Sequence, residues 1–253
     1  MTQYETMYEQ KKMTAEQALQ LIQDHDYMFS AQASGEPAAI LDKLQYLKET
    51  GVKDTIINTC LPLKDYPWLH DQEMKGIMFH NGWFFCGPLR QSQKEKLTSA
   101  VPQRSTTILR HTLDRIRYEG RRPVVLATVS PMDKNGYMTL SVSAIYERDL
   151  INAGALTIVE VNPNFPRTFG DTLVHISEVA AVVESDRPIP CAKLAPYTET
   201  DAAIGRYIAE LIEDGSTIQL GIGNIPNAVA NELKAKKHLG IHTEMFTETM
   251  VDL

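Results

Sequence analysis

The chain has 253 residues, of which 43% are hydrophobic and 23% are charged, and its formal net charge is −7. This acidic balance argues against a nucleic-acid partner, which requires a basic surface. No apolar run reaches the length of a membrane span, and the polar first residues lack the apolar core of a signal peptide, so we expect a cytoplasmic protein with no membrane partner.

The first elements follow a helix, strand, turn and helix pattern. Apolar spacing predicts a helix over 14–24 with Thr14 as its N-cap, and a strand over 27–31. The turn 32–37 follows this strand, and Pro37 is expected to open a helix that continues through Leu47. An ordinary strand-to-helix turn is the simplest interpretation of 32–37.

The pattern of strands alternating with helices continues along the chain. Pro123 to Val129 is an almost continuous apolar run, which is typical of a strand buried on both faces. This alternation predicts an α/β fold with an open parallel sheet. Further strands are expected over 54–60, 76–85, 137–142, 156–161, 174–176 and 179–183, and further helices over 91–96 and 107–118.

A linker with three prolines, 184–196, divides the chain into two predicted domains, 1–190 and 191–253. In the second domain we expect a helix over 199–213, capped by Thr198, a strand over 216–220 and a helix over 227–236. A further short strand should end near Glu244.

The stretch Gln219, Leu220, Gly221, Ile222, Gly223, Asn224 combines a strand end, a glycine turn and a helix start. Such a loop presents free backbone N–H groups at a positive helix end, so it can hold a phosphate or an oxyanion. Glu244 would lie at the same carboxyl edge of a parallel sheet. From the residues alone, tight strand-to-helix packing explains the loop equally well, and a lone glutamate near a strand end is usually a solvated residue.

Three motifs resemble the acetyl-CoA hydrolase/transferase family, a group of family I CoA-transferases. In chain order they are Glu160 to Pro166, Gly221 to Val229 and Gly240 to Met245. Within the family, the likeness is strongest to butyryl-CoA:acetate and 4-hydroxybutyrate CoA-transferases. It implies two open parallel-sheet CoA-transferase domains, the second truncated. The family continues well beyond the position of Glu244, so we expect the chain to be an N-terminal fragment.

The resemblance also implies a reaction mechanism. Glu244 would attack an acyl-CoA carbonyl, the amide of Ile222 would stabilise the oxyanion, and the loop from Gln219 to Asn224 would contact CoA. CoA would move from butyryl-CoA to acetate through a glutamyl-CoA thioester, with the CoA thioester as a substrate and without a cofactor. The resemblance further implies a homo-oligomer and makes three residues candidates for the substrate cleft, namely Ser34, Gly35 and Pro37.

Several alternatives remain open at this point. A hydrolase of the same family would pass the acyl group to water, and a non-catalytic fragment would bind CoA without turnover. A metal site at His238, His242 and Glu244 is disfavoured because Gly240 and a strand-like stretch interrupt any helix there, so no metal is expected. A nicotinamide site is disfavoured because the third glycine of its fingerprint is absent.

Overall fold

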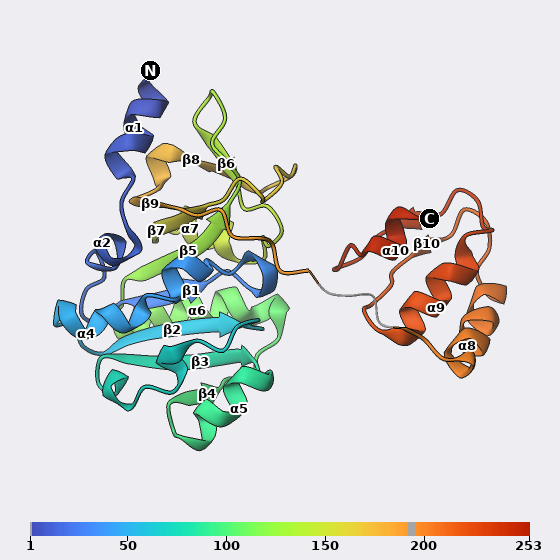
Figure 1. Ribbon diagram of the computed structural model, residues 1–253, viewed down its shortest axis with the longest axis horizontal. Helices are drawn as coiled ribbons and strands as arrows, with labels where there is room; N and C mark the ends of the chain where they lie inside the picture. Colours follow the sequence, from blue (N-terminus) through green and yellow to red (C-terminus); the bar gives the residue numbers. More distant parts are fainter. Residues whose placement is uncertain (1, 192–195) are drawn as a thin grey trace. The chain divides into compact units, whose positions relative to one another are not determined.

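A computed structural model describes residues 2–191 and 196–253, so the middle of the predicted linker lies outside the described residues. The chain divides into two compact units, Met1–Pro190 and Cys191–Leu253 (Figure 1).

The larger unit is built on a sheet whose neighbouring strands are all parallel. Residues 2–191 contribute seven strands to it, in the order β4-β3-β2-β1-β5-β7-β9. This confirms the predicted parallel α/β fold. The strands are β1 (Tyr27–Ser30), β2 (Thr55–Cys60), β3 (Met78–Phe84), β4 (Thr98–Ala100), β5 (Pro123–Val129), β7 (Leu156–Val161) and β9 (Ala181–Glu184).

The strand order reverses between β1 and β5. From β1 the chain adds β2, β3 and β4 on one side, and it adds β5, β7 and β9 on the other. In open α/β sheets, ligands bind outside the carboxyl ends of the strands where the order reverses. The turn 31–37 leaves β1 at this point.

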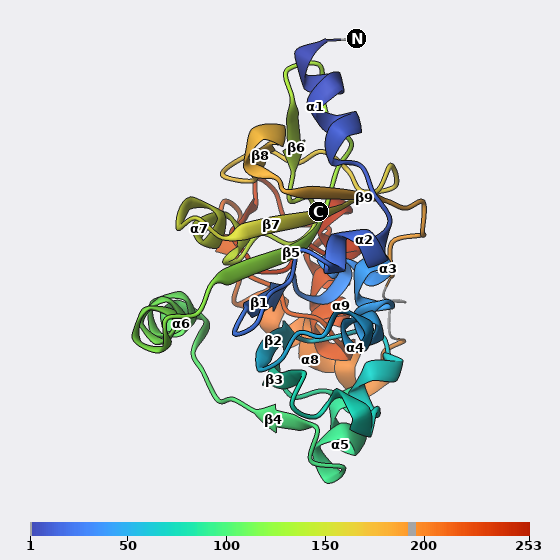
Figure 2. The same cartoon turned by 90° about the vertical axis from the view of Figure 1, so that its left-hand side faces the viewer.

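Helices cover both faces of the sheet. Figure 2 shows α6 and α7 on one face and α2, α3 and α4 on the other. The helices of this unit are α1 (Gln3–Lys11), α2 (Ala15–Leu19), α3 (Ala38–Leu41), α4 (Leu47–Thr50), α5 (Gly87–Lys94), α6 (Ser105–Glu119) and α7 (Glu147–Asn152).

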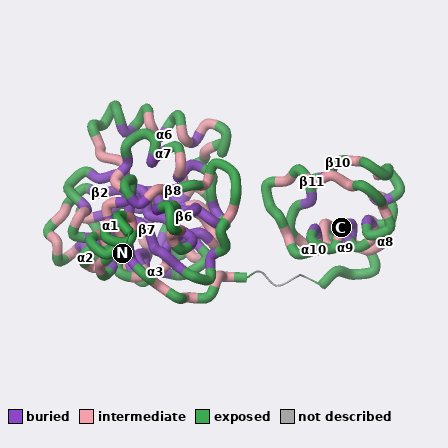
Figure 3. The backbone as a smooth tube through the Cα atoms, turned by 90° about the horizontal axis from the view of Figure 1, so that it is seen from above, coloured by how far each residue is buried: buried purple, intermediate pink, exposed green. Residues whose placement is uncertain are grey.

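Alternate strand residues supply two cores, one on each face of the sheet. Met28 and Ile57 pack with α2, α3 and α4, whereas Phe29 and Val125 pack with α6 and α7. Because β5 contributes to both cores, its sequence is almost entirely apolar. Figure 3 shows the buried residues of this unit concentrated along its strands.

The helix predicted over 14–24 ends earlier than expected, at Leu19. Thr14 and Gln17 form the reciprocal capping box of α2, which confirms Thr14 as the N-cap. After Leu19 the chain turns, because the buried Asp26 carboxylate accepts the N–H of Gln23 at 2.7 Å and pairs with Arg122 at 2.6 Å. This tertiary ion pair overrides the local helical pattern.

The helix predicted from Pro37 is broken into short pieces. A 3-10 turn at Leu44–Tyr46 separates α3 from α4. Leu41, Leu44 and Leu47 are all fully buried. Their spacing of three residues fits the 3.0 residues per turn of a 3-10 helix better than a continuous α-helix.

The strands predicted over 137–142 and 174–176 lie outside the parallel sheet. They form β6 (Tyr137–Thr139) and β8 (Leu173–His175), which pair with each other in antiparallel fashion. The helix predicted over 91–96 begins earlier, because Pro88 stands in the first turn of α5.

The described residues of the smaller unit form three helices that pack around a core of their own. Its elements are α8 (Glu199–Glu210), β10 (Thr217–Ile218), α9 (Asn224–Leu233), β11 (Gly240–Ile241) and α10 (Glu248–Val251). Thr198 caps α8 as predicted. Gly205 permits close contact between helices, since a Cβ there would lie 3.0 Å from the carbonyl group of Ala228 in α9.

Candidate functional site

The glycine loop and the Glu244 segment lie side by side in the smaller unit. The short strands β10 and β11 are parallel, with Thr217 opposite Gly240 and Ile218 opposite Ile241. Beyond them, the Thr243 hydroxyl donates to the carbonyl oxygen of Leu220 at 3.2 Å. The two segments therefore leave the same carboxyl edge, which is the arrangement that the sequence predicts.

Gly223 shapes the loop. It is the N-cap of α9 and has a φ of 132°, in the region that favours glycine. Within residues 2–191 and 196–253, no side chain caps this helix end. The first backbone N–H groups of α9 are therefore available to an anion, and Pro226 stands within the first turn, where a missing N–H is tolerated.

Glu244 is exposed on the smaller unit, as are Gly221 and Asn224 of the loop. Three apolar side chains beside these residues are also exposed: Ile222 by 68%, Met245 by 46% and Phe246 by 68%. Exposed apolar side chains therefore accompany Glu244 both in its own segment and in the glycine loop.

The candidate cleft residues Ser34, Gly35 and Pro37 belong to the larger unit, at the reversal point of its strand order. The Ser34 hydroxyl donates to the carbonyl oxygen of Pro190 at 3.3 Å. Gly35 and Pro37 are buried, and a Cβ on Gly35 would lie only 2.4 Å from Cβ of Ser143. Only glycine fits there.

The structure adds Glu36 to this turn. Its side chain is buried, and burial raises the pKa of the carboxyl to about 7, although the nearby Tyr66 hydroxyl and the Arg187 guanidinium act in the opposite direction. The Tyr66 hydroxyl is itself buried, and burial together with the adjacent Glu36 carboxyl raises its pKa. The sequence carries no signal for this burial, because a glutamate in a turn is ordinarily solvated.

Arg187 joins the turn to the neighbouring strands. Its Nε binds Oε1 of the fully buried Glu160 at 2.7 Å, and its Nη2 donates to the backbone carbonyl of Glu36 and to the Thr128 hydroxyl. Glu160 also accepts the N–H of Ala39 at 2.8 Å. The signal in the sequence was a charged residue inside the apolar run of β7, which requires a buried partner.

The loop from Asn162 to Pro166 holds the backbone of the segment that contains Arg187. The Asn162 side-chain amide donates to the carbonyl oxygen of Arg187 at 2.9 Å, and that of Asn164 donates to the carbonyl oxygen of Asp186 at 2.8 Å. The motif therefore fixes the backbone from which Arg187 projects. We find no group in it that is placed for a chemical step.

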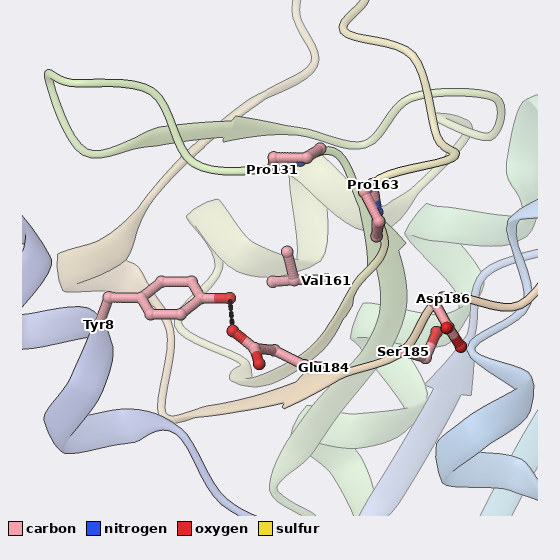
Figure 4. Close-up of a pocket in the computed structure, with 7 residues that line it drawn as sticks. All are labelled: Tyr8, Pro131, Val161, Pro163, Glu184, Ser185 and Asp186. Atoms are coloured by element: carbon pink, nitrogen blue, oxygen red, sulfur yellow. Dashed lines mark hydrogen bonds between the residues drawn. The ribbon is translucent and has the colours of Figure 1, made fainter.

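A cavity of about 500 Å³ lies at the carboxyl ends of β7 and β9 (Figure 4). The Tyr8 hydroxyl donates to Glu184 at 3.0 Å across it, and Lys12 pairs with the other oxygen of Glu184 at 2.6 Å. Burial and the adjacent Glu184 carboxylate raise the pKa of Tyr8. The residues that line the cavity are Tyr8, Pro131, Val161, Pro163, Glu184, Ser185 and Asp186.

Among residues 2–191 and 196–253, no cluster of three or more His, Cys, Asp or Glu side chains could hold a metal ion. No helix in the same residues is long and apolar enough to cross a bilayer. Strand β11 lies between His238 and His242, as the sequence predicts.

Comparison with known proteins decides the family. The model for the acetyl-CoA hydrolase/transferase N-terminal domain matches residues 1–193. The chain belongs to the acetyl-CoA hydrolase/transferase family. The predicted resemblance is thereby confirmed.

Relatives in this family are CoA-transferases. The chain is 35% identical over 252 residues to succinyl-CoA:cyclohexane-1-carboxylate CoA transferase of Geobacter metallireducens, covering 99% of the chain and 56% of that protein. It is 34% identical over 254 residues to 4-hydroxybutyrate coenzyme A transferase of Clostridium kluyveri, covering 99% and 57%. The chain thus spans little more than half the length of these relatives.

Among solved structures, RipA from Yersinia pestis is similar over the whole chain. The TM-score is 0.90 at 28% sequence identity, and the match covers 100% of this chain and 60% of RipA. The fold of both units is therefore found in an experimentally determined structure.

Proposed function

We propose that this chain carries the acyl-transfer site of a CoA-transferase that moves CoA from an acyl-CoA to a short-chain carboxylate. The observation that supports it best is the parallel pairing of β10 and β11, which brings the glycine loop and Glu244 to one edge. Backbone donors and a carboxylate nucleophile are the two groups that this reaction requires.

In the first half of the reaction, an oxygen of Glu244 attacks the thioester carbonyl carbon. The resulting tetrahedral oxyanion accepts a hydrogen bond from the amide of Ile222, a contribution of about 3 kcal/mol by comparison with other acyl-transfer sites. The C–S bond then breaks, and the CoA thiolate leaves an acyl-glutamyl anhydride behind.

In the second half, the thiolate attacks the glutamyl carbonyl and displaces the carboxylate of the former acyl group. A glutamyl-CoA thioester remains. An acceptor carboxylate attacks it and reverses the same steps, so that CoA leaves on the acceptor and the Glu244 carboxylate is restored. CoA enters as a substrate, and no cofactor or metal takes part.

The exposed apolar side chains in the segment of Glu244 and in the glycine loop support this role. A carboxylate in water is a weak nucleophile because hydration stabilises it. An acyl-CoA bound over Ile222, Met245 and Phe246 would cover apolar surface and displace water from Glu244. The exposed state of these side chains is the state expected before the substrate binds.

Butyryl-CoA and acetate are the substrate pair that the sequence resemblance favours, and a homo-oligomer is the assembly that it favours. The two relatives described above are named for other acids, so the proposal fixes the reaction type more firmly than the acyl chain. Acetate, succinate and 4-hydroxybutyrate form the acceptor set to compare.

Exchange of labelled acetate into acetyl-CoA, with butyryl-CoA as the donor, tests the proposal. We expect exchange with the unaltered chain and a loss of about a thousandfold or more in Glu244→Gln. The matched control is Glu248→Gln, which removes an exposed carboxylate four residues away and should retain activity. Exchange that persists in Glu244→Gln would contradict the assignment of the nucleophile.

The alternatives give different results in the same assay. A hydrolase releases free CoA from butyryl-CoA without any acceptor acid. A non-catalytic chain binds CoA but shows neither exchange nor release. Either outcome would replace the transferase proposal.

A further inference from the structure

A second cavity lies at the opposite edge of the main sheet from the turn 31–37. Its volume is about 320 Å³, and it is lined by residues at the amino ends of β2, β3 and β4. Nothing in the proposed reaction uses this edge. The volume falls in the range of small-molecule sites.

Four apolar residues are among those that line this cavity. Phe79 lies opposite Ile56 in the register of β2 and β3, and both line the cavity with Met78 and Leu97. Ile56, Met78 and Leu97 are buried, whereas Phe79 is 46% exposed. An aromatic ring that is half exposed beside the buried Ile56 is a suitable surface for an apolar ligand.

Two uncompensated cations stand at the rim. Lys75 and Lys96 line the cavity and are exposed, and neither ammonium group has an ion-pair partner within the described part of the chain. The carboxylate at the rim, Asp54, is already engaged by Arg121 at 3.0 Å and by His25 at 2.6 Å. The free charge facing the cavity is therefore positive, in a protein whose net charge is −7.

The turns that supply this rim are well defined. Asp54, Gly76 and Lys96 each precede a strand and have positive φ values of 52°, 82° and 60°. The backbone N–H of Asp54 donates to the carbonyl oxygen of Gly76 at 2.9 Å, which joins two of the turns. The two lysines are thus carried by turns that the sheet fixes.

We infer that this cavity binds a small organic anion with an apolar body. The anionic head, a carboxylate or a sulfonate, would lie between Lys75 and Lys96, and the apolar body would lie against Phe79 and Leu97. A neutral or cationic molecule of the same shape would lack the interaction with the two lysines. This site is independent of the proposed acyl transfer.

Titration of the isotopically labelled 253-residue chain with octanoate, followed by NMR, tests the inference. We expect shifts of the amides of Gly76, Phe79 and Leu97. Under the same conditions, 1-octanol and octylamine, which have the same chain length, should bind at least about tenfold more weakly. Equal binding of octanol, or no shift at these amides up to about 10 mM octanoate, would overturn the inference.

Charge variants complete the test. Lys75→Gln with Lys96→Gln should weaken octanoate binding about tenfold or more, whereas Lys94→Gln, which removes an exposed lysine outside the lining, should leave it unchanged. Both altered lysines are exposed, so the melting temperature should not change. Lys75→Glu with Lys96→Glu should reverse the preference toward octylamine. Retained preference for octanoate in this last variant would refute the role of the lysines.

Discussion

Glu36 places an ionisable carboxyl in the interior of the larger unit, and this has a consequence for stability. Its pKa rises from 4.5 to about 7 because burial disfavours the charged form. The folded protein therefore retains a proton that the unfolded chain has lost. The contribution of this group is fully present below about pH 4.5 and is lost as the pH rises through about 7.

Glu36→Gln should remove this dependence. Relative to Glu36→Gln, the unaltered chain should lose about 3 kcal/mol of unfolding free energy between these two pH values. Urea unfolding across this pH range measures the difference, with Glu49→Gln, an exposed position, as the control. Parallel pH profiles for the unaltered chain and Glu36→Gln would contradict a raised pKa.

Arg187 and Glu160 form a buried ion pair. The change in unfolding free energy should depend on whether one partner or both are removed. Arg187→Met leaves a fully buried carboxylate without its cation, so we expect a destabilisation of about 3 to 5 kcal/mol. Glu160→Met together with Arg187→Met removes both charges and should recover much of that loss. Denaturant unfolding of the two single variants and the double variant gives the coupling; simple addition of the single effects would show that the pair is not coupled.

At the scale of elements, the glycine loop should tolerate change at one glycine and not at the other. Gly223→Ala must adopt a φ of 132° at the start of α9, at a cost of about 1 to 3 kcal/mol. Gly221→Ala meets only ordinary contact, with Pro226 Cγ at 3.9 Å. Hydrogen exchange of the α9 amides should therefore accelerate in Gly223→Ala and change little in Gly221→Ala. Equal effects would contradict the described loop conformation.

Strands buried on both faces were predictable from the sequence, and short helices were not. The predicted bounds of β5 and β7 match the structure because a continuous apolar run leaves few alternatives. The end of α2 depends on the ion pair of Asp26 with Arg122, two residues 96 positions apart. Local periodicity contains no information about such a contact.

In the candidate site, too, some features were predictable from the sequence and others were not. The two predicted strands placed the glycine loop and Glu244 at one edge, since parallel strands deliver their carboxyl ends together. Glu36 and Tyr66 were not predicted, because their burial arises only when the turn after β1 packs against later segments. The roles of Glu244 and of the loop remain proposals.

At the scale of the whole molecule, the family assignment and the fold both indicate a CoA-transferase architecture. The chain spans slightly more than half the length of the two relatives described above. The larger unit supplies an open sheet with its strand-order reversal at the Ser34 turn. The smaller unit supplies the loop and the carboxylate on which the proposed reaction depends. The central claim is therefore that Glu244 forms a covalent thioester with CoA and passes CoA from one acid to another.

Mass spectrometry of the chain after incubation with butyryl-CoA in the absence of an acceptor tests this claim most directly. We predict a CoA adduct confined to the peptide that contains Glu244, absent from Glu244→Gln and discharged on addition of acetate. An adduct on another residue, or acetate-dependent exchange without any adduct at Glu244, would contradict the account.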